Sequence, residues 1–253
     1  MNRSVVWVLV ALALRGPPPG AAQGWRLAAW VGYDRVTGSP DWRSFGGQLT
    51  WSAAAGHAVW AAVEALDRFG ERDASEKLGV LVHPSARWWA SLEAGTAIGP
   101  ELVPKNSWEL DVTARATTRL AAGVGYRRQN YVVGAVDLVM PHASLAAGGL
   151  TWDARMFVTR NPSRRTDAAG LVRATRPLSG RVEAWVGGGG GRESYLVGAP
   201  PVQEVRSLET LTGTAGVRVQ VRAGFSVRVD GTVVRSRPVL SRRGFAIAIE
   251  RRF

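Results

Sequence analysis

Three histidines are the side chains best suited to acid–base chemistry near neutral pH: His57, His83 and His142. His57 lies in a predicted turn, His83 precedes Pro84, and His142 follows Pro141. No serine lies two residues from a histidine within one predicted strand, and no acidic residue is placed to orient a ring, as a hydrolytic triad requires. We therefore predict a non-enzymatic protein without a cofactor. The alternative is a barrel enzyme acting on lipid or glycan through a Ser–His pair assembled across strands.

Other kinds of chemical site are disfavoured by composition and spacing. The chain has no cysteine, which excludes thiolate metal sites and disulfides. No His/Asp/Glu cluster has the spacing of a metal site. The run Gly187–Gly191 is followed by Arg192 and Glu193, without the Lys-Ser/Thr of a phosphate-binding loop. We expect these glycines to let a strand bend or to leave space near a wall.

The chain is strongly basic, with 32 Lys and Arg against 20 Asp and Glu, a formal net charge of +12. Apart from short pairs such as Arg164-Arg165 and Arg242-Arg243, its arginines are spread through the alternating segments. Nucleic-acid-binding proteins gather their basic residues in a patch or on one helix face. We therefore expect no nucleic-acid partner.

Apolar and polar residues alternate with period two along most of the chain. In SWELDVTARA, Trp108, Leu110 and Val112 share one face, and Glu109 and Asp111 share the other. GVRVQVR and FSVRVDG follow the same rule. Successive residues of a β-strand point to opposite faces, so each segment is a strand with one apolar and one polar face. The Ala-rich tract 57–69 is ambiguous between helix and strand, and we interpret it as a strand.

About fourteen such segments are predicted, and their links alternate between long and short. Many segments exceed ten residues, the length that a tilted strand needs to cross a bilayer. Outer-membrane barrels have short periplasmic turns and longer outer loops. We therefore predict an all-β, antiparallel, up-and-down transmembrane β-barrel, with twelve strands as the alternative because Pro141 interrupts one segment and the turn after it is not tight. A secreted β-sandwich is the remaining alternative. The predicted segments are 25–35, 42–53, 57–69, 74–83, 86–97, 106–116, 118–128, 133–143, 147–160, 166–178, 181–195, 207–221, 224–238 and 242–253.

The terminal sequence FAIAIERRF is a strand that carries apolar residues on one face. A barrel must pair its last strand with its first, because an open edge in lipid leaves backbone groups unpaired. We expect Phe253 to take part in this closure at the periplasmic end. Tryptophans near strand ends are expected in the interfacial aromatic girdles; these are Trp25, Trp42, Trp51, Trp88 and Trp108.

Residues 1–23 have the features of a signal peptide. Arg3 gives a positive start, Val5–Leu14 is an apolar run too short to span a bilayer, and small residues precede a cleavage site near Gln23. We predict export to the outer membrane, with residues 24–253 forming the barrel. The predicted partners include outer-membrane lipids and the barrel assembly machinery.

Short motifs rich in glycine and aromatic residues recur in order along the chain. They are Gly32-Tyr33-Asp34, Trp42 before a Gly-rich strand, Arg68-Phe69-Gly70 with Asp73 and Gly79, and Gly125-Tyr126-Arg127. Their order and spacing resemble the YaiO-type outer-membrane β-barrel family over nearly the whole mature chain. The resemblance implies a link with envelope polysaccharide or its export components. Family members often carry an N-terminal tetratricopeptide region, which this sequence lacks.

The polar faces of the predicted strands carry charges of both signs. One interpretation is a mutually paired polar interior, because unpaired buried charges are costly. The other is a passage for charged solutes whose selectivity is set by these side chains. The predicted lining residues are Glu64, Arg68, Glu93, Glu109, Asp111, Arg115, Arg127, Asp137, Asp153, Arg155, Arg173, Glu183, Arg218, Arg228, Asp230, Glu250 and Arg252.

Overall fold

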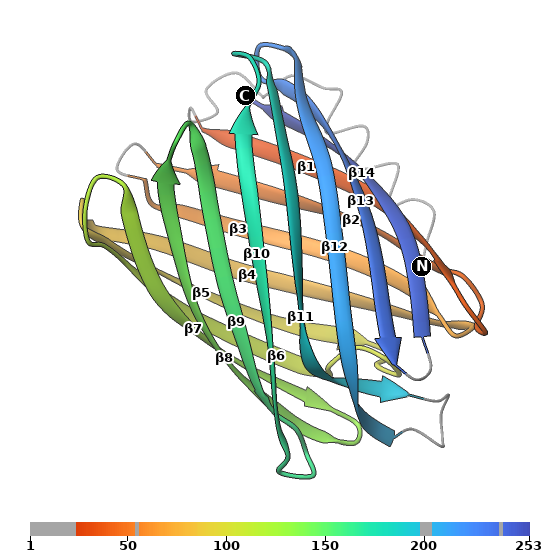
Figure 1. Cartoon of the computed structure of the whole chain (residues 1–253). Coiled ribbons are helices and arrows are strands. Elements are labelled where there is room, and N and C mark those ends of the chain that lie inside the picture. Colours follow the sequence, from red (N-terminus) through yellow and green to blue (C-terminus); the bar gives the residue numbers. More distant parts are fainter. Residues whose placement is uncertain (1–23, 54–55, 198–203, 238–239) are drawn as a thin grey trace.

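The computed structural model describes residues 24–53, 56–197, 204–237 and 240–253. They form fourteen strands in one closed antiparallel barrel (Figure 1), which confirms the predicted fold and makes the twelve-strand and sandwich alternatives wrong. The predicted signal peptide, residues 1–23, lies outside the described residues and stays a prediction. The strands are β1 (Trp25–Val36), β2 (Trp42–Ser52), β3 (Ala58–Arg68), β4 (Glu71–Ser85), β5 (Trp88–Ile98), β6 (Asn106–Arg115), β7 (Leu120–Tyr131), β8 (Gly134–Ala147), β9 (Leu150–Arg160), β10 (Thr166–Pro177), β11 (Val182–Val197), β12 (Glu204–Arg222), β13 (Phe225–Arg237) and β14 (Leu240–Arg252).

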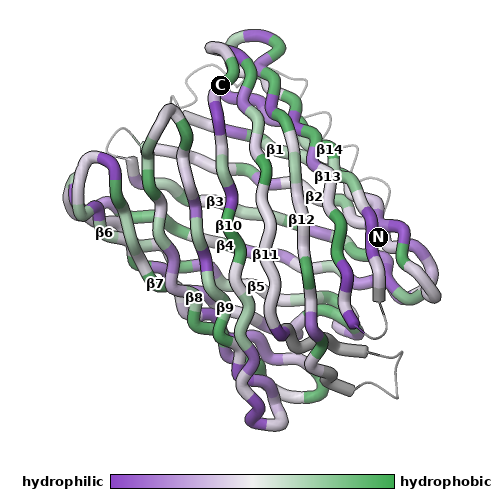
Figure 2. The backbone as a smooth tube through the Cα atoms, in the orientation of Figure 1, coloured by the Kyte–Doolittle hydropathy of each residue, from purple (hydrophilic) through white to green (hydrophobic). Residues whose placement is uncertain are grey.

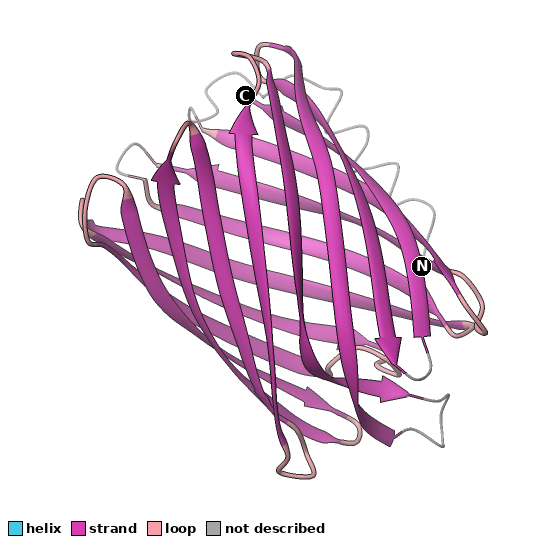
Figure 3. Ribbon diagram, in the orientation of Figure 1, coloured by secondary structure: helices cyan, strands magenta, loops and turns pink. Residues whose placement is uncertain are grey.

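The barrel closes where β14 pairs with β1, in a register that runs from Arg26↔Arg252 to Val36↔Arg242. Beyond the last strand, the Phe253 amide donates to the Trp25 carbonyl at 2.9 Å. Strand closure satisfies backbone groups that would otherwise form an open edge. Strands make up most of the described chain (Figure 3), and no helix within it is long and apolar enough to cross a membrane.

The two faces of the wall differ as the alternation predicts, and hydropathy changes sign along many strands (Figure 2). Val112, Val219 and Ile247 are 40%, 38% and 39% exposed on the outer face. Their chain neighbours Asp111 and Arg218 point inward, where they meet side chains of other strands. Large apolar side chains exposed around the outside of a barrel are what a lipid-facing surface requires.

Pro141 lies inside β8, where it interrupts the ladder to β9 between Val139↔Val158 and His142↔Arg155. The turn that follows is tight, contrary to the prediction. Gly148 and Gly149 form the two-residue link, with φ angles of 62° and 73°. Positive φ at both central residues matches the right-handed twist of a hairpin, and glycine adopts it without strain.

The links differ less in length than predicted. At the end opposite the termini, 37–41, 99–105 and 161–165 are loops, but Phe69-Gly70 and Val132-Val133 are two-residue links. The residues expected in loops there extend the strands instead. Glu71 and Asp73, for example, belong to β4 and pair with Arg68 and Leu66 of β3.

Candidate functional site

A cavity of about 740 Å³ occupies the middle of the barrel along the wall formed by β1, β2 and β9–β14. A second cavity of about 450 Å³ shares Glu183, Arg218, Ser226 and Glu250 with it. This second cavity extends to the turns 178–181 and 223–224, at the end of the barrel where Phe253 meets Trp25. Together the two cavities extend from this end of the barrel toward its middle. The charged residues around the larger cavity are Arg26, Asp153, Arg173, Glu183, Arg218, Arg228, Asp230 and Glu250.

Most of these charges lie in ion pairs that face the cavity. Glu250 accepts from Arg218 at 3.0 Å and from Arg252 at 3.2 Å. Arg228 lies 2.9 Å from Asp230, and Arg173 lies 3.2 Å from Asp153. Solvent-exposed pairs of this kind contribute only about 0–1 kcal/mol each to stability. Their main consequence is to place guanidinium and carboxylate groups next to one another around the cavity.

The opposite wall, from β3 to β8, carries a second set of polar contacts. One oxygen of Glu109, Oε2, accepts from both Nε and Nη2 of Arg127. Glu93 accepts from the indole Nε1 of Trp60 at 3.1 Å and lies 3.5 Å from Lys77. Glu64 lies with Glu93, Glu109 and Arg127 around a small cavity of about 150 Å³.

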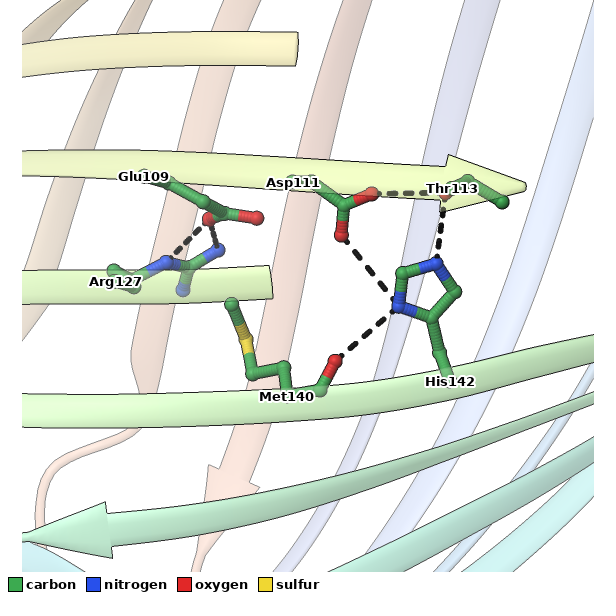
Figure 4. A network of polar contacts seen from close by, with 6 residues as sticks. All are labelled: Glu109, Asp111, Thr113, Arg127, Met140 and His142. Carbon is green, nitrogen blue, oxygen red and sulfur yellow. Dashed lines mark hydrogen bonds and ion pairs between the residues drawn. The ribbon is translucent and has the colours of Figure 1, made fainter. Parts of the chain in front are cut away.

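Next to the Glu109–Arg127 pair, His142 joins β8 to β6 (Figure 4). The imidazole Nε2 lies 3.0 Å from Thr113 Oγ1, and Nδ1 lies 3.2 Å from the Met140 carbonyl and 3.5 Å from Asp111 Oδ2. Thr113 also donates to Asp111 Oδ1 at 3.0 Å. Both ring nitrogens of His142 therefore have a polar partner.

The expectation that no acidic residue orients a histidine is therefore wrong for His142. A serine also lies two residues away, because β8 continues to Ala147 and so includes Ser144; likewise β4 includes Ser85 beyond His83. The order hydroxyl–imidazole–carboxylate resembles a hydrolytic triad. However, Thr113 is 5% exposed and its hydroxyl donates to the carboxylate rather than to the ring. This arrangement favours a structural or charge-tuning role over a nucleophile.

Two glycines of β7 let β6 and β8 meet over the strand between them. A Cβ atom at Gly123 would lie 2.6 Å from His142 Nε2, and one at Gly125 would lie 2.9 Å from Asp111 Oδ2. The inward positions of LAAGVGYRR thus hold glycine where the neighbouring strands hold Asp111, Thr113 and His142. This pattern of small residues is the sequence signal for the cluster.

The 99–105 loop, between β5 and β6, folds against the inner face of the same wall. Val103 and Pro104 line the small cavity together with Glu64, Lys77 and Arg127. The buried carboxylate of Asp73, 2% exposed, accepts hydrogen bonds from three backbone amides of the loop: Glu101 at 3.1 Å, Leu102 at 2.6 Å and Val103 at 2.7 Å. A carboxylate bound by several backbone amides is a strong anchor. The loop therefore narrows the lumen on this side.

Trp42, expected in an aromatic girdle, is instead buried inside the barrel at 6% exposure. Its ring lies between the guanidinium groups of Arg68 and Arg242, 5.0 Å and 5.3 Å from the centroid, and Arg242 lies 3.6 Å from Asp34. The pairing of Trp42 with Asp34 in β1 fixes this inward direction. The end of the lumen nearest the 37–41 loop is therefore occupied by aromatic and guanidinium groups.

The remaining predicted residues are placed as follows. Arg115 lies near the turn 116–119, its guanidinium 5.9 Å from the Trp89 ring, and Arg155 pairs in register with His142. Asp137 was expected inside but lies on the outer face, where it contacts Tyr126 and Arg128. In this part of β8 the usual arrangement is reversed. The apolar Met140, 1% exposed, fills the inner side, and the charged Asp137 lies on the outer side.

The other two histidines meet each other at the end of the barrel that holds the short turns. The His83 amide lies 3.2 Å from His57 Nδ1, and the His83 ring stacks on Trp89 at 5.7 Å. The first of these contacts ties His57 to β4. These contacts bring no carboxylate or hydroxyl to either ring.

Comparison with solved structures places this architecture among outer-membrane proteins. The chain is similar to the CymD monoaromatic hydrocarbon channel, with a TM-score of 0.67 at 8% identity over 100% of this chain and 93% of that one. It is similar to a bacterial polysaccharide outer membrane secretin, with a TM-score of 0.57 at 11% identity over 91% of this chain and 99% of that one. It is also similar to the Acinetobacter baumannii outer membrane protein Omp33, with a TM-score of 0.55 at 12% identity over 90% of this chain and 98% of that one.

No family model matches the chain, and no curated protein matches it significantly. At identities of 8–12%, the structural similarities establish the fold rather than the activity. The closed topology, the apolar outer face and the structural neighbours all support the same fold assignment. The chain has the fold of the outer-membrane β-barrel proteins.

Proposed function

We propose that this protein is a non-enzymatic outer-membrane pore for polar solutes. The observation that carries the proposal is the pair of joined cavities, about 740 and 450 Å³, lined by paired charges and open at one end of the barrel. A barrel whose only task was structural could fill its interior with packed side chains, as small barrels do. A cavity lined by charged side chains instead suits the passage of hydrated solutes.

In this proposal the lumenal residues set selectivity. Arginines and carboxylates alternate around the cavity, so neither sign of charge dominates the middle of the passage. The 99–105 loop and the Trp42 group form its narrow part. Solutes that cross it would exchange water for guanidinium, carboxylate and hydroxyl contacts.

We further propose that the chain is a YaiO-type barrel with a role in envelope polysaccharide export or transport. The resemblance of its motifs supports this assignment, and one of its structural neighbours is titled a polysaccharide secretin. Outer-membrane lipids would contact the apolar outer face, and the barrel assembly machinery would insert the chain. Polysaccharide or its export components would be the physiological partner.

Liposome swelling tests the pore with solutes of defined size. Purified barrel, shown to be folded by heat-modifiable gel mobility, is reconstituted into liposomes, and the uptake of small neutral solutes is followed. Wild-type protein should give swelling that falls as solute size rises. Ala248→Trp, which places a large ring in the cavity, should slow uptake, whereas Val219→Trp on the outer face should not. Absence of swelling from the folded wild-type barrel would refute the proposal.

A further inference from the structure

Three tryptophans on the inner face of the barrel lie opposite a glycine of the next strand. The cross-strand pairs are Trp30↔Gly46, Trp60↔Gly79 and Trp185↔Gly216. A Cβ atom added at Gly46 or Gly216 would lie 2.3 Å from Cζ2 of its tryptophan. Each indole therefore packs directly on the backbone of the neighbouring strand. All three side chains remain partly exposed in spite of this packing.

Shielding of a glycine by an aromatic ring stabilises a sheet, and this accounts for the packing of all three pairs. It does not account for their different surroundings. Trp60 donates its Nε1–H to Glu93 and lies outside the lining of the large cavity. Trp30 and Trp185 both line that cavity, on strands β1 and β11. Two tryptophans packed on glycine thus line the same cavity.

The polar groups around these two rings are close enough to share a ligand with them. Gln48 and Thr214 supply an amide and a hydroxyl in the same cavity, and Arg218 and Asp230 supply charged groups. The volume of about 740 Å³ lies within the range of small-molecule sites, about 300–1,000 Å³. Such sites combine flat apolar surface with a few polar groups that fix orientation.

A sugar ring has the chemistry that fits both parts of this site. Its C–H face carries weak positive charge and suits the negative face of an indole. Its hydroxyl groups form bidentate contacts with guanidinium, carboxylate and amide groups. The cavity is lined by four arginines and four carboxylates, so its formal charges cancel and a polyanion gains no net attraction. A neutral saccharide therefore matches the site better than a nucleic acid or an acidic polymer.

We infer that Trp30 and Trp185 are stacking platforms of a subsite for neutral saccharide chains in the lumen. The inference deepens the proposed pore, since it names the class of solute and the residues that bind it. Rings held on glycine lose no further freedom when a sugar stacks on them, so binding costs little ordering entropy.

Isothermal titration of the detergent-folded barrel tests the subsite without any need for conduction. The probes are maltohexaose, chitohexaose and mannohexaose, with a polyethylene glycol of similar size as the non-sugar control. At least one hexasaccharide should bind, and the glycol should not. Trp30→Leu and Trp185→Leu, which keep an apolar side chain over the glycine but remove the flat ring, should each weaken binding about tenfold or more, as expected for a lost stacking contact.

Trp60→Leu is the matched control, because it removes the same kind of tryptophan–glycine pair outside the cavity. Trp152→Leu, on the outer face, controls for general effects on the barrel. Both should bind as the wild type does. No binding of any hexasaccharide, or an equal loss in Trp60→Leu, would overturn the subsite. Binding without solute flux would keep the subsite and refute the pore, and flux without binding would do the reverse.

Discussion

At the scale of single residues, the lumen is organised by contacts between strands that are not neighbours. Asp111 and His142 belong to β6 and β8 and meet only because Gly123 and Gly125 leave space on β7. The ring makes contacts with an acid, a hydroxyl and a carbonyl, and Arg155 lies opposite it in register on β9. The pair formed by Glu109 and Arg127 lies beside this group.

We predict that the Asp111 carboxylate of this cluster contributes to ion selectivity, because it lies on the inner face of the wall beside His142. Asp111→Asn removes one negative charge from the lumen, so reversal potentials across a salt gradient should shift toward anion selectivity. An unchanged reversal potential in that variant would show that this carboxylate does not act on the conducting path.

At the scale of elements, one buried carboxylate on β4 holds the 99–105 loop against the inner face of the wall. Asp73 accepts from the amides of Glu101, Leu102 and Val103. Hydrogen bonds to a charged group are worth roughly 1.5–3 kcal/mol each. The base of the loop is held at Lys105, whose amide donates to the Asn130 carbonyl and whose carbonyl accepts from the Ala97 amide.

Asp73→Ala should release the loop and raise single-channel conductance, because the narrow part of the passage loses its anchor. Current noise should rise as well, since the freed loop samples several positions. Asp67→Asn is the matched control in the same hairpin, where an exposed pair with Arg72 contributes only about 0–1 kcal/mol. Unchanged conductance in Asp73→Ala would mean that the loop does not limit the current.

The sequence pattern predicted the elements well and the contacts between them poorly. Alternation placed the fourteen strands within a few residues, because one lipid face and one polar face leave little choice of register. It failed for Asp137 and Trp42, where apolar residues fill the inside and reverse the usual polarity. It also missed the tethers at Asp73 and His142, because distance across a curved wall depends on which strands carry glycine.

At the scale of the whole molecule, the seam between β1 and β14 determines whether a barrel exists at all. The Phe253 amide donates to the Trp25 carbonyl, so the terminal residue extends this seam. Burial of its ring contributes at most about 2 kcal/mol, and a charge at the interface adds roughly 0–1 kcal/mol. Neither is enough to unfold a finished barrel, but closure has no alternative partner strand.

Phe253→Asp should therefore lower the amount of inserted barrel far more than Trp88→Ala, which removes an exposed outer-face ring elsewhere on the wall. The molecules that do insert should have nearly wild-type thermal stability. Quantitative blotting of outer-membrane fractions and thermal melts of purified protein measure the two effects. Wild-type abundance of Phe253→Asp would show that assembly does not depend on this position.

Single-channel recording in planar bilayers tests the central claim, that the joined cavities form a water-filled passage across the membrane. Protein verified as folded by heat-modifiable mobility should give stepwise currents that scale with salt concentration, and Ala248→Trp should reduce each step. The absence of current steps from both the folded wild-type protein and Asp73→Ala would contradict the account, because it would mean that the lumen is closed even without the anchor of the 99–105 loop.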